Sequence, residues 1–223
     1  MKKAGSFWSL PFPSQTNHHP YGHLICTPVS LLAATSYLNI LSSDEDDTEQ
    51  QVRNCFTKNH VDQMMIASHK LYSDFFSKAG NQLMIQEIYP WIPQGAFDMI
   101  EAAGLIVSEH QEEQCHHIIA TGGGSKDLLL MPLYSLLNQF SSRSRQNNCK
   151  MSIIVTTRGH SVCFMCSEYG GLFMFDPLPA VLCFVPHFML KEFLMQQIFS
   201  LDTPRSDFQD VEYSALVLTK HIV

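Results

Sequence analysis

The chain has 223 residues, 45% of them hydrophobic, and a formal net charge of −7. It is long enough to bury one substantial core, so we expect one domain rather than two. The negative net charge argues against nucleic acid as a partner, because phosphate binding requires clustered Lys and Arg. No stretch approaches the roughly 18 continuous apolar residues of a membrane span, so no membrane association is expected.

The cysteine content and the N-terminal residues indicate a reducing compartment. The seven cysteines are odd in number and too sparse for a disulfide scaffold. Two lysines stand near the start of the chain, but no apolar stretch follows them as it does in a secretory signal. We therefore expect a cytoplasmic protein, or one delivered into a host cytosol.

The sequence around Cys26 predicts a helix that begins close to this residue. Thr27 is an acceptable N-cap, Pro28 suits a first helical turn, and apolar residues then repeat at helical spacing. A thiol at a helix N-terminus lies at the positive end of the helix dipole, which favours the nucleophilic thiolate. The alternative is an inert core cysteine, since free cysteine is among the most buried residue types.

The middle of the chain has mainly helical character. Helices are predicted over residues 48–57, 59–78, 94–103 and 127–140, and short strands over 105–109 and 118–120. We interpret the acidic run 43–49 as a solvated loop that leads into a helix. Residues 141–148 are interpreted as a mobile polar connector to the strand-rich part of the chain.

Strands and turns dominate after residue 150. Strands are predicted over 151–157, 161–166, 171–175, 181–185 and 213–219, with a helix over 186–199. Turn residues over 167–171 predict a hairpin, which places His160 at the start of one strand beside Asp176 at the end of the next. A carboxylate holds a neighbouring histidine in one tautomer and stabilises the imidazolium that forms when it takes a proton from a thiol.

Two patterns have the residue types of a zinc site, and neither is expected to bind metal. Cys163 and Cys166 match Cys-x-x-Cys but fall in a predicted strand, where side chains three positions apart point to opposite faces. Cys115, His116 and His117 are neighbours in a predicted extended segment, where adjacent side chains also diverge.

In order and context, these segments resemble the papain-like cysteine peptidases. Cys26 opens an apolar helix, His160 begins a distant strand, and Asp176 closes the partner strand. Within that group they are similar to compact deubiquitinases of the viral-tegument-like, Josephin and MINDY families. The resemblance covers residues 12–40 and 150–180. It departs from the herpesvirus tegument enzymes, whose catalytic histidine comes just after the aspartate, because proline and leucine follow Asp176 here.

The resemblance implies an α+β, papain-like fold. A helical N-terminal portion would carry the nucleophile at a helix N-terminus and pack on an antiparallel sheet. We expect a single domain over residues 1–223, with an N-terminal segment (1–25), a mainly helical portion (26–145) and a mainly β portion (150–223).

The resemblance also implies the chemistry of the site. Cys26 would attack the carbonyl, His160 would transfer protons and Asp176 would orient His160. A side-chain amide before the cysteine usually donates to the oxyanion, and Gln15 is the candidate, with Asn17 as the alternative. Both could equally be ordinary loop residues.

The implied substrate is the isopeptide bond that follows the C-terminal Gly-Gly of ubiquitin. The expected partners are ubiquitin or polyubiquitin chains, the enzyme is expected to be a monomer, and no cofactor is expected. Two alternatives stay open. One is another papain-like thiol enzyme, such as a ubiquitin-like-protein protease, a general peptidase or an acyltransferase. The other is a protein-binding module without catalysis, in which Cys26 is buried and Asp176 only caps a turn.

Overall fold

The computed structural model describes residues 6–13, 25–41, 43–79, 100–101, 103–115, 126–157, 160–178, 180–194 and 211–220. Its strands are β1 (Trp8–Pro11), β2 (Leu105–Cys115), β3 (Met151–Thr157), β4 (Ser161–Cys166), β5 (Leu172–Asp176), β6 (Val181–Val185) and β7 (Val211–Lys220). Its helices are α1 (Cys26–Leu38), α2 (Glu45–Cys55), α3 (Lys58–Ala79), α5 (Lys126–Gln146) and the short 3-10 helix η3 (His187–Met189).

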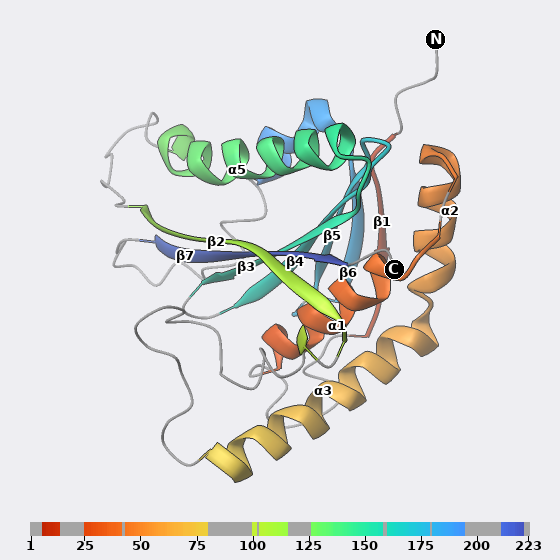
Figure 1. Ribbon diagram of the computed structural model, residues 1–223, viewed down its shortest axis with the longest axis vertical. Coiled ribbons are helices and arrows are strands. Elements are labelled where there is room, and N and C mark those ends of the chain that lie inside the picture. The colour runs from red at the N-terminus through yellow and green to blue at the C-terminus, as the bar shows by residue number, and fades with distance from the viewer. Residues whose placement is uncertain are drawn as a thin grey trace.

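The described strands form one antiparallel sheet in the order β1-β6-β5-β4-β3-β7-β2. Helices α1, α2 and α3 lie on one face of this sheet, and α5 lies on the other (Figure 1). The predicted α+β fold, with a helix that starts at Cys26 packed on an antiparallel sheet, is confirmed. In the described part of the chain, no helix has the length and apolar character needed to cross a membrane.

Because helices cover both faces, the central strands are buried on both sides. Along β4, Cys163 and Met165 face the core beneath α1, α2 and α3, here called the α1 core. Phe164 and Cys166 face the core beneath α5. A sheet covered on both faces favours apolar residues on both sides, which explains why polar residues do not alternate along β4 after Ser161.

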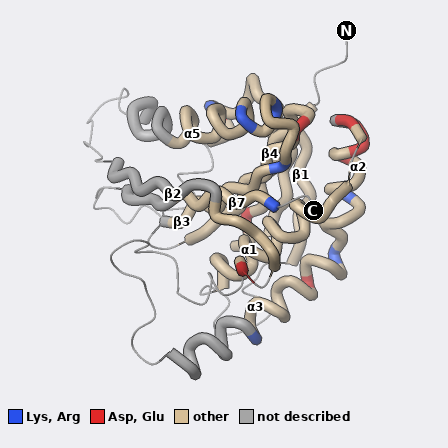
Figure 2. The backbone as a smooth tube through the Cα atoms, in the orientation of Figure 1, with Lys and Arg blue, Asp and Glu red and all other residues tan. Residues whose placement is uncertain are grey.

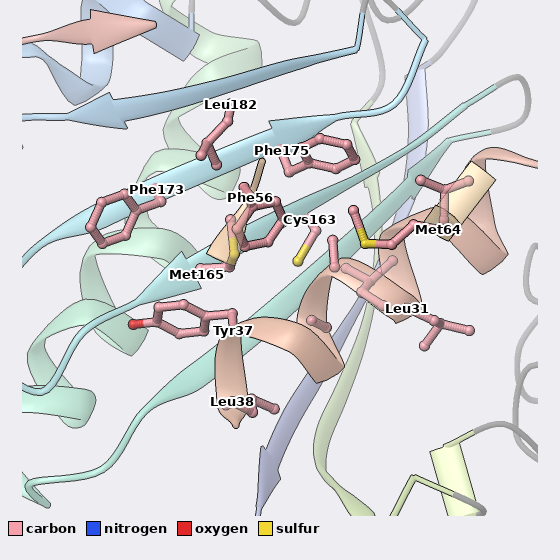
Figure 3. Close-up of a cluster of buried hydrophobic side chains, with 14 of the residues drawn as sticks. Leu31, Tyr37, Leu38, Phe56, Met64, Cys163, Met165, Phe173, Phe175 and Leu182 are labelled. Carbon is pink, nitrogen blue, oxygen red and sulfur yellow. The ribbon is translucent and has the colours of Figure 1, made fainter. Parts of the chain in front are cut away.

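The α1 core fixes the helix that carries Cys26 against the hairpin that carries Asp176. Tyr37 of α1 points toward the strands in this core (Figure 3). The ring centroids of Tyr37 and Phe173 are 6.2 Å apart, and those of Phe56 and Phe175 are 5.6 Å apart. Aromatic pairs at such distances add to the stability gained from burial. Tyr37 therefore holds α1 on β5, and Phe56 holds the end of α2 on the same strand.

The acidic run is part of a helix rather than a loop before one. Asp44 is the N-cap of α2, and its side chain accepts a hydrogen bond of 2.9 Å from the backbone N–H of Asp47. Acidic residues accordingly gather at the start of α2 (Figure 2). Negative charge is favoured at this end of a helix by the dipole, which explains why the helix begins earlier than residue 48.

The predicted polar connector after residue 140 is wrong over residues 141–146, which continue α5. Ser141 and Ser144 are fully buried, one turn apart on the same helix face. The Ser144 hydroxyl lies 2.5 Å from the carbonyl oxygen of Cys149 and 3.1 Å from that of Cys166. The Ser141 hydroxyl pairs with His187 Nε2 at 2.9 Å. Both serines have hydrogen-bond partners, so a polar composition is compatible with a packed helix here.

Other predicted elements differ in extent or lie outside the described residues. β2 extends to Cys115 rather than ending at 109, because it pairs with β7 along its length. Residues 100–101 are helical, and Gly104 ends this segment with φ +65° and an N–H that donates to the Glu101 carbonyl. Residues 187–194 form η3 and a helical turn, and the strand at 118–120 lies outside the described residues.

Candidate active site

Cys26 is the first residue of α1, as the sequence predicts. The cap itself differs from the expectation, because Ile25 is the N-cap and its carbonyl accepts the Val29 N–H at 3.0 Å. Thr27 lies inside the helix, and its hydroxyl pairs with Ser161 Oγ instead, at 2.8 Å. Ile25 makes no side-chain cap hydrogen bond, so the Cys26 thiol lies at the positive end of a helix without an N-cap side-chain acceptor.

The β4–β5 hairpin brings His160 and Asp176 together. In its turn, the Ser167 N–H donates to the Gly171 carbonyl at 2.8 Å, and Gly170 has φ +103°, which favours glycine. His160 Nε2 lies 2.7 Å from Asp176 Oδ1, and these residues are 5% and 2% exposed. The contact of His160 with Asp176 that the sequence predicts is present in the structure.

Asp176 is itself held in place by its own turn. Its Oδ1 atom also accepts the backbone N–H of Leu178 at 3.0 Å. This bond fixes the carboxylate in the orientation that meets the imidazole ring.

Cys26 contacts His160, which in turn contacts Asp176. Burial raises the pKa of the Cys26 thiol. The hydrogen bond and charge of His160, together with the N–H and hydroxyl of Ser161, outweigh burial and lower this pKa below its usual value. An imidazole has two ring nitrogens, and Nε2 faces Asp176. Nδ1 is therefore the nitrogen that faces the sulfur.

His160 is the positive member of the pair. Burial lowers the pKa of His160, but the hydrogen bonds and charges of Asp176 and Cys26 outweigh burial and raise it from 6.5 to about 9. A cysteine with a lowered pKa beside a histidine with a raised pKa forms a thiolate–imidazolium pair near neutral pH. This is the protonation state that nucleophilic thiol catalysis requires.

The other described cysteines have the opposite electrostatic character. Burial raises the pKa of each of these thiols: Cys55, Cys149, Cys163, Cys166 (to about 12) and Cys183 (to about 11). Among the six cysteines described, Cys26 is the one whose environment favours the thiolate.

The candidate zinc patterns do not come together in the part of the chain that the structure describes. Cys163 and Cys166 face opposite cores, as expected for residues three apart in a strand. Within the described ranges, no three His, Cys, Asp or Glu residues are arranged to hold a metal ion. His116 and His117 lie outside those ranges, as do Gln15 and Asn17.

Sequence reasoning missed Ser161, which contacts Cys26 through both its N–H and its hydroxyl. It directly follows His160 and is 1% exposed. The signal available in the sequence is a pair of hydroxyl residues, Thr27 and Ser161, each next to a catalytic candidate.

The chain has the papain-like fold of the cysteine proteases. Its fold is similar to that of the ubiquitin-specific protease encoded by murine cytomegalovirus tegument protein M48, which was crystallised in complex with a ubiquitin-based suicide substrate. The TM-score is 0.57 at 15% sequence identity, over 97% of this chain and 88% of that chain. The predicted likeness to papain-like enzymes of the viral-tegument type is thus confirmed at the level of the fold.

A weaker similarity extends to the Pseudomonas avirulence protein AvrPphB, with a TM-score of 0.45 and 15% identity over 86% of this chain and 90% of that chain. No protein-family model and no curated protein sequence matches the chain.

Proposed function

We propose that the protein is a thiol-dependent deubiquitinase that hydrolyses isopeptide bonds after the ubiquitin C-terminal Gly-Gly. The observation that carries the proposal is the buried series in which Asp176 contacts His160 and His160 contacts Cys26. A buried thiol without a base, or a histidine without an orienting carboxylate, would not favour catalysis in this way.

In the proposed first step, the Cys26 thiolate attacks the isopeptide carbonyl carbon, and the carbonyl electrons move to the oxygen. The Cys26 backbone N–H at the start of α1 would donate to this oxyanion. We propose the side-chain amide of Gln15 as the second donor, with Asn17 as the alternative. Loss of one such donor typically lowers kcat by a factor of about 10²–10³.

Collapse of the tetrahedral intermediate breaks the carbon–nitrogen bond, and His160 gives the Nδ1 proton to the leaving lysine amine. Cys26 then carries ubiquitin as a thioester. His160 takes a proton from water, the resulting hydroxide attacks the thioester, and the thiolate leaves. Asp176 keeps the imidazole ring in place through both transfers.

The choice of ubiquitin as substrate is supported by the fold shared with a protease crystallised with a ubiquitin-based suicide substrate. We propose ubiquitin or polyubiquitin chains as the partners and a monomer as the active form. The six described cysteines are free, which suits a reducing compartment. We therefore propose the cytosol as the site of action, or a host cytosol after delivery.

Hydrolysis of isopeptide-linked diubiquitin tests the proposal. We expect wild-type protein to release monoubiquitin, Cys26→Ala to release none, and the matched variant Cys149→Ala to keep the wild-type rate, because burial raises the pKa of Cys149. Cleavage of a small peptide but not of diubiquitin would instead support a general peptidase. Inertness toward both substrates would support a binding module.

A further inference from the structure

Ser161 joins the three elements that meet at the nucleophile. It is the first residue of β4, and its hydroxyl oxygen lies 2.8 Å from Thr27 Oγ1 of α1 and 2.9 Å from Thr156 Oγ1 of β3. The same hydroxyl contacts the Cys26 sulfur. All four residues are less than a tenth exposed, so water does not compete freely for these bonds.

The number of protons in this cluster allows one arrangement in which Ser161 donates to the Cys26 sulfur. A serine hydroxyl offers one proton and two lone pairs, and a thiolate only accepts. If Ser161 donates to the Cys26 sulfur, both lone pairs stay free to accept the protons of Thr27 and Thr156. This arrangement satisfies every hydroxyl in the cluster.

The backbone of Ser161 also faces the start of α1. Its N–H donates to the Cys26 sulfur, and its carbonyl oxygen accepts the Ser30 hydroxyl at 3.2 Å. Ser30 and Thr27 lie one turn apart on the same face of α1. Both backbone groups and the side chain of Ser161 therefore contact the helix that presents the nucleophile.

We propose that Ser161 is a positioning residue that locks Cys26 against His160 and donates a hydrogen bond to the thiolate, with Thr27 and Thr156 orienting its proton. This inference rests on the proposed function, because it concerns the same nucleophile.

The cluster can be separated experimentally from the charges of the site. Among the described residues, His160 is the titratable group that acts on Cys26, and Asp176 in turn acts on His160. Ser161 is neutral, so Ser161→Ala removes a hydrogen bond and leaves both charges in place. A hydrogen bond to a charged group is stronger than one between neutral groups, so its loss should be measurable in the ionisation of the thiol.

The test is the rate of Cys26 alkylation by iodoacetamide as a function of pH, followed by mass spectrometry. The midpoint of this profile is the pH at which the rate reaches half its maximum as the thiol ionises. We expect Ser161→Ala to move this midpoint upward by about one pH unit. Ser161→Thr keeps the hydroxyl and should restore the wild-type midpoint. Thr156→Val removes one orienting hydroxyl without changing side-chain shape, and it should give a smaller upward shift.

Ser152→Ala is the matched control, because Ser152 is buried in β3 at the opposite end of the β3–β4 pairing, across from Met165. Its midpoint should equal that of the wild type. Wild-type midpoints in both Ser161→Ala and Thr156→Val would overturn the role of Ser161 and leave the proposed function intact. An upward shift in Ser161→Thr as large as that in Ser161→Ala would also overturn it. Absence of a rapidly alkylated Cys26 in the wild type would instead contradict the proposed function.

Discussion

Replacement of Asp176 by asparagine tests how the site controls the charge of His160. The variant keeps the size of the side chain and an oxygen that accepts the His160 Nε2 proton. In the wild type, Nε2 lies 2.7 Å from Asp176 Oδ1. The substitution removes the negative charge. The rise in the pKa of His160 from 6.5 to about 9 corresponds to about 3 kcal/mol in favour of the imidazolium.

Asp176 supplies a large part of this preference, because its hydrogen bond is the leading contribution that raises the pKa. A hydrogen bond to a charged group contributes roughly 1.5–3 kcal/mol, so its weakening should lower the pKa of His160 by about one to two pH units. The imidazolium is the form lost as pH rises. The alkaline limb of activity, near pH 9 in the wild type, should therefore move to lower pH in Asp176→Asn.

The assay is kcat/KM for a fluorogenic ubiquitin substrate across this pH range, with Asp46→Asn as the control. Asp46 is an exposed carboxylate in the first turn of α2, and its loss should leave the profile unchanged. At pH 6.5 we expect Asp176→Asn to keep much of its activity, because His160 is still protonated there. An alkaline limb that stays at the wild-type position in Asp176→Asn would refute the reasoning.

Three further outcomes are expected. His160→Ala should lose nearly all activity, because no other described group faces Cys26 as a base. Asp176→Ala should keep a small but measurable activity, and equal kcat values for the two variants would contradict these roles. The stabilisation that comes from the raised pKa of His160 is complete below pH 6.5 and is lost as pH rises through about 9. The urea midpoint of the wild type should therefore fall over this range. A fall just as large in Asp176→Asn would argue against His160 as its cause. Ser144→Ala should lower the free energy of unfolding by about 1–3 kcal/mol, because it removes the one hydroxyl proton that the carbonyls of Cys149 and Cys166 share. We expect kcat to stay at the wild-type value. An unchanged urea midpoint would show that this proton contributes little.

The parts of the site that the sequence predicts depend on local chain geometry. The helix start at Cys26 follows from residues next to it, and the contact of His160 with Asp176 follows from a hairpin of short span. Antiparallel pairing and a turn are enough to determine which residues face each other. The strands after residue 150 were predictable for the same reason.

The parts that could not be predicted depend on how distant elements dock. Thr27 meets Ser161 across 134 positions of sequence, and this contact determines that Thr27 does not cap the helix. The serines of α5 look like a connector until their partners, His187 for Ser141 and the Cys166 carbonyl for Ser144, are known. Hydroxyl residues suit caps, loops and buried networks alike, so tertiary packing decides among these roles.

Ubiquitin bearing a C-terminal electrophile tests the central claim most directly. Its reaction needs both recognition of the ubiquitin tail and a thiolate at Cys26, and the modified residue can be located by mass spectrometry. The account predicts one covalent adduct on Cys26 of the wild-type protein, and no adduct in Cys26→Ala. Labelling at another cysteine, or no labelling of a folded protein that still cleaves a small peptide, would contradict the account.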